Sequence, residues 1–254
     1  MYRGVRVAVV MPAFHEARHI ERALAGVPAF VDRIVVVDDA SRDETAARAE
    51  AFPDARVEVV RHPHNRGVGA AIATGYGVAF GEGERAAADV AVVMAGDAQM
   101  DPADLPRLLD PVVEGRAEYA KGDRLRWPGA RARMPASRWL GNQVLSALTR
   151  WATGLPVNDS QCGYTALTRE AAARLDLRAL WPRYGYPNDL LAALARVGAR
   201  VCDVPVRPVY ADETSGVGWI DALVVVPALL VRASVLRGRP ALEERSEPVA
   251  ERPA

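Results

Sequence analysis

Residues 33–45 have the sequence RIVVVDDASRDET, in which a short β-branched run ends in two adjacent aspartates. An unbroken apolar run of this length is typical of a strand that is buried on both faces. Residues 5–11 (apart from Arg6) and 89–95 are similar runs, and residues 56–60 (RVEVV) are predicted as a further strand. The segments between them show helical spacing, as in Ile20, Ala23, Leu24 and Val27. Strands of this kind that alternate with helices predict an α/β protein with a mostly parallel sheet and helices on both faces.

The composition restricts the class of protein. The chain has 254 residues, is 50% hydrophobic, and has 32 Lys+Arg against 32 Asp+Glu. This length suits one α/β domain, and the balanced charge gives no reason to expect a nucleic-acid partner. Cys162 and Cys202 are too few for a disulfide framework, so we expect free thiols and a cytoplasmic protein. The first apolar run stops at Pro12, too early for a signal peptide, and we interpret it as a strand.

The second half of the chain has a different pattern. Residues 127–138 combine Pro, Gly and Arg and are expected to form a loop. A helix is predicted from Ser137 to Trp151, ending at Gly154, and another is expected to be capped by Asn188. Residues 199–210 return to strand character.

The C-terminal region has an apolar stretch, residues 218–236, that is interrupted by Asp221, Pro227 and Arg232. A membrane-spanning helix needs roughly 17–25 apolar residues, and these interruptions argue against one. We expect an apolar or amphipathic helix that lies on a membrane face, or that packs on the protein or on a second copy. Residues 237–254 are rich in Glu, Arg and Pro and are expected to be a disordered tail.

Polar side chains follow the predicted strands where ligands bind in parallel sheets, beyond the carboxyl ends of the strands. The three ends are residues 11–16, 38–41 and 96–99. We expect them to converge on one cleft. The alternative is that such carboxylates only cap the turns that follow them. Ser41 and Glu44 also match a capping box for the next helix.

Asp97 and Gln99 are the candidate metal ligands. Mg²⁺ or Mn²⁺ in proteins takes one or two carboxylates together with waters and phosphate oxygens. Such a cation offsets the charge that develops on a departing diphosphate. The alternative is a solvated loop aspartate. Residues 65–69 (NRGVG) could bring backbone N–H groups to a phosphate, or could be an ordinary helix start.

Six motifs, in order, resemble those of the family 2 glycosyltransferases. Residues 12–16 (PAFHE) resemble P-x-[YF]-N-E, and residues 37–45 (VDDASRDET) resemble V-D-D-x-S-x-D-x-T. Residues 65–71 resemble N-x-G-x-G-x-A, and residues 97–102 resemble D-x-Q-x-x-P. Residues 121–124 resemble K-G-S-R, and residues 159–164 resemble D-S-Q-C-G-[FY]. The branch that transfers sugars to dolichyl or polyprenyl phosphate is the most similar one.

The resemblance implies a GT-A fold with Rossmann-like character and an inverting single displacement. It implies a domain over residues 1–217, with a nucleotide-sugar part (1–125) and an acceptor part (126–217). The implied nucleotide-sugar-binding residues are Pro12, Ala13, Phe14, Glu16, Asp39, Gly67, Asp97 and Arg124. Asp97 and Gln99 would hold the metal, and Asp159 would lie near the acceptor.

The chain departs from the family pattern in three places. His15 stands where Asn is usual, and Ala95 and Gly96 stand where many members have another Asp. Residues 210–217 lack the basic residues that the family often has there. This last departure weakens the expectation that the loop binds an acceptor phosphate.

The acceptor decides which residues act on it. A hydroxyl acceptor needs a base, for which Asp159 is the first candidate and Asp189 the second. A lipid phosphate needs cations instead, and Arg131, Arg138 and Gln161 are the candidate acceptor-binding residues.

The sequence therefore predicts transfer of a hexose from a UDP- or GDP-sugar to polyprenyl phosphate at the cytoplasmic membrane face, by a chain that can self-associate. The alternatives are a soluble hydroxyl acceptor, a nucleotidyltransferase, or a non-catalytic nucleotide-sugar binder. A nucleotidyltransferase normally has a Gly-rich loop after its first strand, where this chain has Pro12-Ala13-Phe14.

Overall fold

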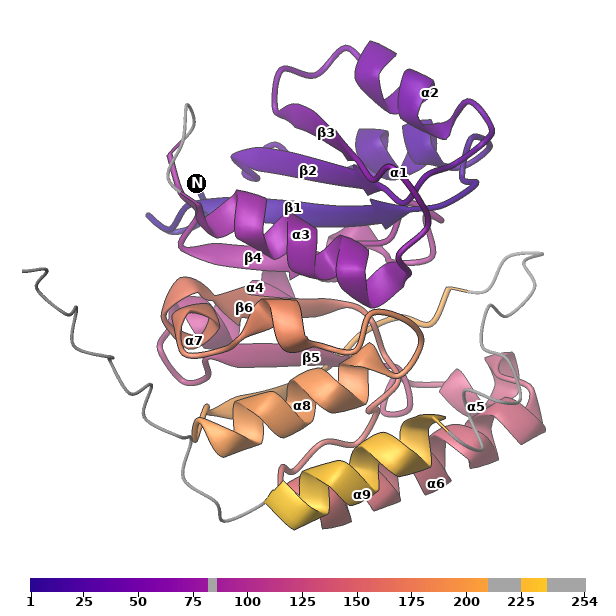
Figure 1. Ribbon diagram of the computed structural model, residues 1–254, viewed down its shortest axis with the longest axis vertical. Coiled ribbons are helices and arrows are strands. Elements are labelled where there is room, and N and C mark those ends of the chain that lie inside the picture. The colour runs from indigo at the N-terminus through magenta and orange to yellow at the C-terminus, as the bar shows by residue number, and fades with distance from the viewer. Residues whose placement is uncertain (82–85, 210–224, 237–254) are drawn as a thin grey trace, which may run out of the picture.

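The computed structural model describes residues 1–81, 86–209 and 225–236. Its centre is a seven-stranded sheet of order β3-β2-β1-β4-β6-β5-β7 (Figure 1). The strands are β1 (Val7–Ala13), β2 (Arg33–Asp38), β3 (Val57–Arg61), β4 (Val90–Val93), β5 (Tyr119–Asp123), β6 (Thr165–Thr168) and β7 (Val201–Pro205). The four strands predicted in the first half are all present, with ends shifted by no more than two residues.

The sheet is mostly parallel, as predicted. Strands β3, β2, β1 and β4 pair in parallel, and β5 pairs in parallel with β7. Only β6, among the described strands, runs antiparallel to both of its neighbours, β4 and β5. The carboxyl ends of β1, β2 and β4 therefore lie at the same edge of the sheet.

Helices cover both faces of the sheet because β1 is apolar on both sides. Val7, Val9 and Met11 belong to a core with α1 (Ile20–Gly26) and α4 (Leu105–Val113). Ala8 and Val10 belong to a second core with α3 (Val68–Phe80) and α8 (Tyr186–Arg196). The remaining short elements are α2 (Thr45–Ala51), η1 (Pro102–Asp104), α7 (Arg169–Ala173) and η2 (Leu177–Ala179).

Two details of the second half differ from the sequence prediction. The predicted loop at 127–138 contains a short helix, α5 (Ala130–Arg133), and the start of α6 (Ala136–Thr153). Helix α6 ends at Gly154 as predicted, with φ of 75°. Asn188 does not cap α8, because the helix begins earlier, after Gly185; its side chain instead accepts a hydrogen bond from Thr149 (3.1 Å).

The described C-terminal part is α9 (Val226–Leu236), which lies beside α6 at one end of the molecule (Figure 1). Val226, Leu230 and Ala233 are buried against Ala152 of α6 and Ala192 of α8. Within the described ranges, no helix has the length and apolar character needed to cross a membrane. Residues 218–224 and the predicted tail at 237–254 lie outside the described residues, and both cysteines are free thiols.

Candidate active site

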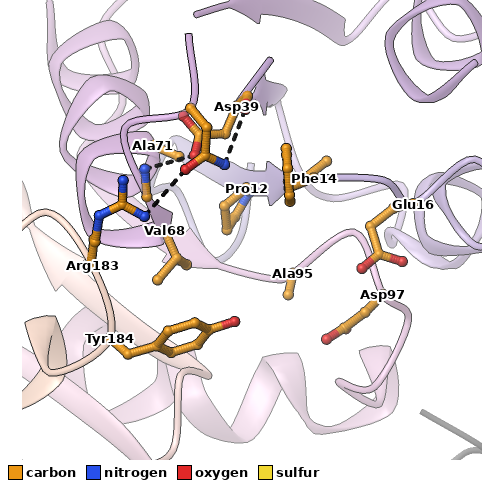
Figure 2. Close-up of a pocket in the computed structure, with 13 residues that line it drawn as sticks. Pro12, Phe14, Glu16, Asp39, Val68, Ala71, Ala95, Asp97, Arg183 and Tyr184 are labelled. Atoms are coloured by element: carbon orange, nitrogen blue, oxygen red, sulfur yellow. Dashed lines mark hydrogen bonds between the residues drawn. The ribbon is translucent and has the colours of Figure 1, made fainter. Parts of the chain in front are cut away.

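The ends of β1, β2 and β4 surround a cleft of about 330 Å³ (Figure 2). Its lining residues are Pro12, Ala13, Phe14, Glu16, Asp39, Asn65, Gly67, Val68, Ala71, Ala95, Asp97, Arg183 and Tyr184. Seven of the eight residues proposed to bind the nucleotide sugar are among them, and Arg124 is not. Figure 2 shows Glu16 and Asp97 on one side of the cleft and Asp39 with Arg183 on the other.

Hydrogen bonds between the first two strand ends hold Glu16 in place. The N–H of His15 donates to Ser41 Oγ (2.9 Å), and the N–H of Glu16 donates to Thr45 Oγ1 (2.8 Å). The predicted capping box is therefore wrong. Helix α2 begins after Glu44 with no side-chain cap, since the Ser41 hydroxyl is used by the neighbouring strand end.

Each of the three strand ends contains a residue with left-handed backbone. The φ angles are 59° at His15, 63° at Ala40 and 57° at Ala98. Outside glycine this conformation costs about 1–2 kcal/mol, and it occurs more often for Asn, Asp and His than for other residues. The exchange of the motif's Asn for His15 is therefore compatible with the turn. Strain of this kind gathers at functional sites, and here it occurs at all three ends that form the cleft.

The carboxylate of Asp39 organises the base of the cleft. It accepts hydrogen bonds from the N–H groups of Arg66 (2.9 Å) and Gly67 (2.7 Å), and its Oδ1 lies 2.7 Å from Nδ1 of His62. A carboxylate has about four acceptor positions, so these contacts leave roughly one on Oδ2. Asp38 behaves as the capping alternative predicted, since its Oδ2 accepts from the N–H of Ser41 (3.2 Å).

Residues 181–184 form the wall of the cleft above α3. Gly67 has φ of 97°, and a Cβ there would lie 2.5 Å from the carbonyl oxygen of Pro182. The same carbonyl accepts from the N–H of Ala70 (3.0 Å). Arg183 donates to Asn65 Oδ1 (3.4 Å). Arg183 and Tyr184 belong to no motif in the sequence, and only the fold shows that they line the cleft.

Of the two predicted metal ligands, Asp97 and Gln99, only Asp97 lines the cleft. Asp97 lines the cleft, and its Oδ1 accepts from the backbone N–H of Gln99 (2.9 Å). Gln99 itself is not a lining residue. In the described part of the chain, no cluster of three or more His, Cys, Asp or Glu side chains could hold a metal alone. A single carboxylate fits a cation that takes its other ligands from a diphosphate and water.

Asp159, the first candidate base, is fully buried. Its carboxylate accepts from Arg124 Nε (2.7 Å) and Nη2 (3.0 Å). Burial acts to raise the pKa of Asp159, but the charge and hydrogen bonds of Arg124, with the charge of Lys121, hold it below its ordinary value. Neither Asp159 nor Arg124 lines the cleft. The geometry makes this pair an internal support beside the sheet.

Asp189, the second candidate base, is also buried and paired. Its Oδ2 accepts from the N–H of Trp181 (2.8 Å), and its Oδ1 pairs with Arg232 of α9. Asp189 therefore joins the C-terminal helix to the segment that forms the cleft wall.

The three candidate acceptor-binding residues lie outside the cleft lining. Arg131 is exposed, with its guanidinium 5.1 Å from the ring centre of Trp139. Arg138 is partly exposed near the start of α6. The Gln161 amide donates to Ser160 Oγ (2.9 Å) and to Asn188 Oδ1 (3.2 Å). Their role in acceptor binding stays a prediction.

Curated relatives cover most of the chain. One is a UDP-N-acetylglucosamine–dolichyl-phosphate N-acetylglucosaminyltransferase of Methanococcus voltae, 26% identical over 84% of this chain and 89% of that protein. Another is an undecaprenyl-phosphate mannosyltransferase of Micrococcus luteus, 31% identical over 80% of this chain and 83% of that protein.

Among solved structures, glucosyl-3-phosphoglycerate synthase from Mycobacterium tuberculosis with UDP has a similar fold, the GT-A fold. The TM-score is 0.69 at 24% identity, over 91% of this chain and 81% of that one. Its complex with Mn²⁺, UDP and glucosyl-3-phosphoglycerate gives a TM-score of 0.63 at 24% identity, over 94% of this chain and 82% of that one.

The family model "Glycosyl transferase family 2" matches residues 8–175, which include the three strand ends, the cleft residues up to Asp97 and the Arg124–Asp159 pair. The chain belongs to glycosyl transferase family 2.

Proposed function

We propose that this glycosyltransferase moves a hexose from a UDP- or GDP-sugar to a polyprenyl phosphate, with a divalent cation and with inversion at the sugar. The observation that supports it best is the placement of Glu16, Asp39 and Asp97 in one cleft at three neighbouring strand ends. These side chains suit the parts of a nucleotide diphosphate sugar: a base N–H, ribose hydroxyls and a cation on the diphosphate.

The base of the nucleotide would lie at the Asp39 end. The unused acceptor position on Oδ2 of Asp39 suits the N–H of a uracil or guanine ring. The exposed ring of Phe14 and the Tyr184 ring offer apolar surface in the same cleft. Arg183 supplies the positive charge that a diphosphate requires.

The divalent cation would be held by Asp97 across the cleft from Asp39. A cation there supplies Lewis-acid stabilisation of the departing diphosphate. The protein orients Asp97 through the N–H of Gln99, and Ala95 stands where many family members have a second Asp. The structurally similar synthase forms a complex with Mn²⁺ and UDP, which supports the choice of Mn²⁺ as the cation to test here.

A phosphate acceptor is favoured over a hydroxyl because of where the two candidate bases lie. Asp159 and Asp189 are both buried and both paired with an arginine. A hydroxyl acceptor requires a carboxylate that can take its proton, whereas a phosphate is already ionised. The names of the two curated relatives, which specify dolichyl and undecaprenyl phosphate, agree with a polyprenyl phosphate acceptor.

A paired lipid experiment tests the acceptor. The protein is incubated with UDP-Glc, UDP-GlcNAc or GDP-Man and Mn²⁺, and with either a polyprenyl phosphate or the corresponding polyprenol. We expect sugar transfer to the phosphate alone. Transfer to polyprenol, or only to soluble hydroxyl compounds, would contradict the phosphate acceptor. The anomeric configuration of the product, measured by NMR, tests the inversion.

Donor and metal binding are measured separately by thermal shift. A donor at one hundred times its dissociation constant stabilises the fold by roughly 2.7 kcal/mol. We expect Asp97→Asn to lose the Mn²⁺-dependent part of this shift. The matched control is Asp110→Asn, since Asp110 lies outside the cleft lining and accepts from Tyr2 instead. An unchanged Mn²⁺ effect in Asp97→Asn would place the metal elsewhere.

A further inference from the structure

The carboxylate of Asp39 has most of its hydrogen-bond capacity filled by the protein. Its Oδ1 accepts from the N–H of Arg66 and lies 2.7 Å from Nδ1 of His62, and its Oδ2 accepts from the N–H of Gly67. Each carboxylate oxygen has about two acceptor positions. Oδ1 is therefore fully used, and Oδ2 keeps one position for a ligand in the cleft.

The last position on Oδ1 is used by His62, a buried residue that directly follows β3. The side chains of His62 and Asp39 are each 4% exposed, so little water reaches this contact. An ionised carboxylate only accepts, so Nδ1 carries the hydrogen, and Nε2 lies 3.0 Å from Thr74 Oγ1 of α3. The N–H of His62 donates to the carbonyl of Asp38 (2.9 Å). Contacts at both ring nitrogens and at the backbone therefore hold the imidazole against Asp39.

Hydrogen-bond donors lie beside this carboxylate on the cleft lining. The Asn65 amide donates to the backbone carbonyl of Asp39 (3.4 Å) and accepts from Arg183 (3.4 Å) (Figure 2). These two partners fix the orientation of the amide, because a carbonyl only accepts and a guanidinium only donates. The amide has a second N–H and the guanidinium has further ones, and both side chains line the cleft. The lining therefore combines one open acceptor position with neighbouring donors.

We propose that the sugar donor is a uridine nucleotide and that His62 excludes guanine by occupying Oδ1 of Asp39. The inference rests on the proposed function and narrows its donor. The edge of uracil has one N–H between two carbonyl oxygens, which matches one acceptor beside donors. The edge of guanine has two adjacent donors, a ring N–H and an amino group, which together need both oxygens of a carboxylate. With Oδ1 filled, the amino group would be left unpaired against the donors of Asn65 and Arg183.

The test measures the dissociation constants of UDP, GDP and CDP by calorimetry, with Mn²⁺ and the full-length wild-type chain. We expect UDP to bind about ten- to a hundredfold more tightly than GDP, because a buried donor of guanine is left unpaired. CDP controls for size, since cytosine has the same ring without the N–H, and it should also bind more weakly than UDP by about tenfold or more. GDP or CDP binding at least as tightly as UDP would overturn this inference alone. Failure of all three nucleotides to bind would overturn the proposed function with it.

Two substitutions of His62 separate its hydrogen bond from the volume of its ring. His62→Phe keeps a ring but frees the position on Oδ1, so the preference for UDP over GDP should fall to about threefold or less. His62→Asn loses the ring but keeps an N–H near the place of Nδ1, so the preference should persist. The matched control is His64→Phe, at an exposed residue outside the cleft lining, which should bind like the wild type. A wild-type preference in His62→Phe, or its loss in His62→Asn alone, would overturn the role of His62. The wild-type comparison of UDP with GDP and CDP stands even where a variant fails to fold.

Discussion

The Asp189 carboxylate joins two parts of the chain that are far apart in sequence, the cleft wall and the C-terminal helix. We predict that it positions the cleft wall and does not act as a base. The informative perturbation is Arg232→Met, which removes the guanidinium and leaves the carboxylate in place. A methionine keeps most of the apolar stem of the arginine, so packing against α8 changes little.

The magnitude follows from the burial of the two partners. The Asp189 side chain is 5% exposed and that of Arg232 is 49% exposed. Removing one partner of a fully buried ion pair destabilises a fold by about 3–5 kcal/mol. Because Arg232 is half exposed and water screens its charge, we expect Arg232→Met to lower the free energy of unfolding by about 1–3 kcal/mol. Because Asp189 holds the N–H of Trp181, part of that energy is lost from the wall that contains Arg183 and Tyr184.

The assay separates positioning from catalysis. Donor affinity is measured by titration, and kcat is measured across pH, for Arg232→Met and for Asp189→Asn. Positioning predicts that both variants weaken donor binding by about five- to fiftyfold and leave the shape of the pH profile unchanged. A catalytic base predicts instead a loss of about 10²–10⁴ in kcat for Asp189→Asn alone. Wild-type donor affinity in Arg232→Met, together with that loss in Asp189→Asn, would refute our interpretation.

Two further predictions concern the cleft floor and a buried carboxylate. Gly67→Ala should destabilise the fold by about 2–4 kcal/mol in urea unfolding and weaken donor binding, because Gly67 has a positive φ and a Cβ there would meet the carbonyl of Pro182. The control is Gly77→Ala, which should stabilise the fold by about 0.5–1 kcal/mol, because a Cβ there would meet nothing within 4 Å. Equal effects of the two substitutions would contradict the close approach of Gly67 to Pro182. Burial raises the pKa of Asp203 to about 6, so its ionisation opposes folding progressively as pH rises from about 4 to 6. The Asp203→Asn side chain can still accept a hydrogen bond from the N–H of Asn158. In parallel urea titrations, its free energy of unfolding should exceed that of the wild type by up to about 3 kcal/mol at pH 7.5 and by little at pH 4. An equal difference at both pH values would show that the charge is not the cause.

The first half of the fold was predictable because its signals are local. The runs that became β1, β2 and β4 are apolar on both faces, and a strand of this kind is typical of a parallel sheet with both faces covered. The second half was harder to predict, because β6 runs antiparallel and is only four residues long. Its direction depends on long-range pairing, which leaves no periodic pattern in the sequence.

Some residues of the candidate site could likewise be predicted from local sequence signals, and others could not. Glu16, Asp39 and Asp97 could be found because they directly follow predicted strands, and the geometry of parallel sheets brings such residues together. Arg183 and Tyr184 could not be found, because a tertiary contact with Gly67 brings their segment over the cleft. The capping box at Ser41 was wrong for a related reason: the hydroxyl had a partner on another strand end, His15.

The two candidate bases show how a motif can identify a family without assigning a role. The segment D-S-Q-C-G begins at Asp159, yet this carboxylate is fully buried and holds Arg124 through two hydrogen bonds. Asp189 is used in a similar way, with Arg232 as its partner. In both cases the arginine explains the buried carboxylate on structural grounds, since a carboxylate away from water requires a paired cation and hydrogen bonds. Under our proposal both carboxylates serve to hold the structure, and an acceptor that reaches the cleft already ionised, such as a phosphate, needs neither of them as a base.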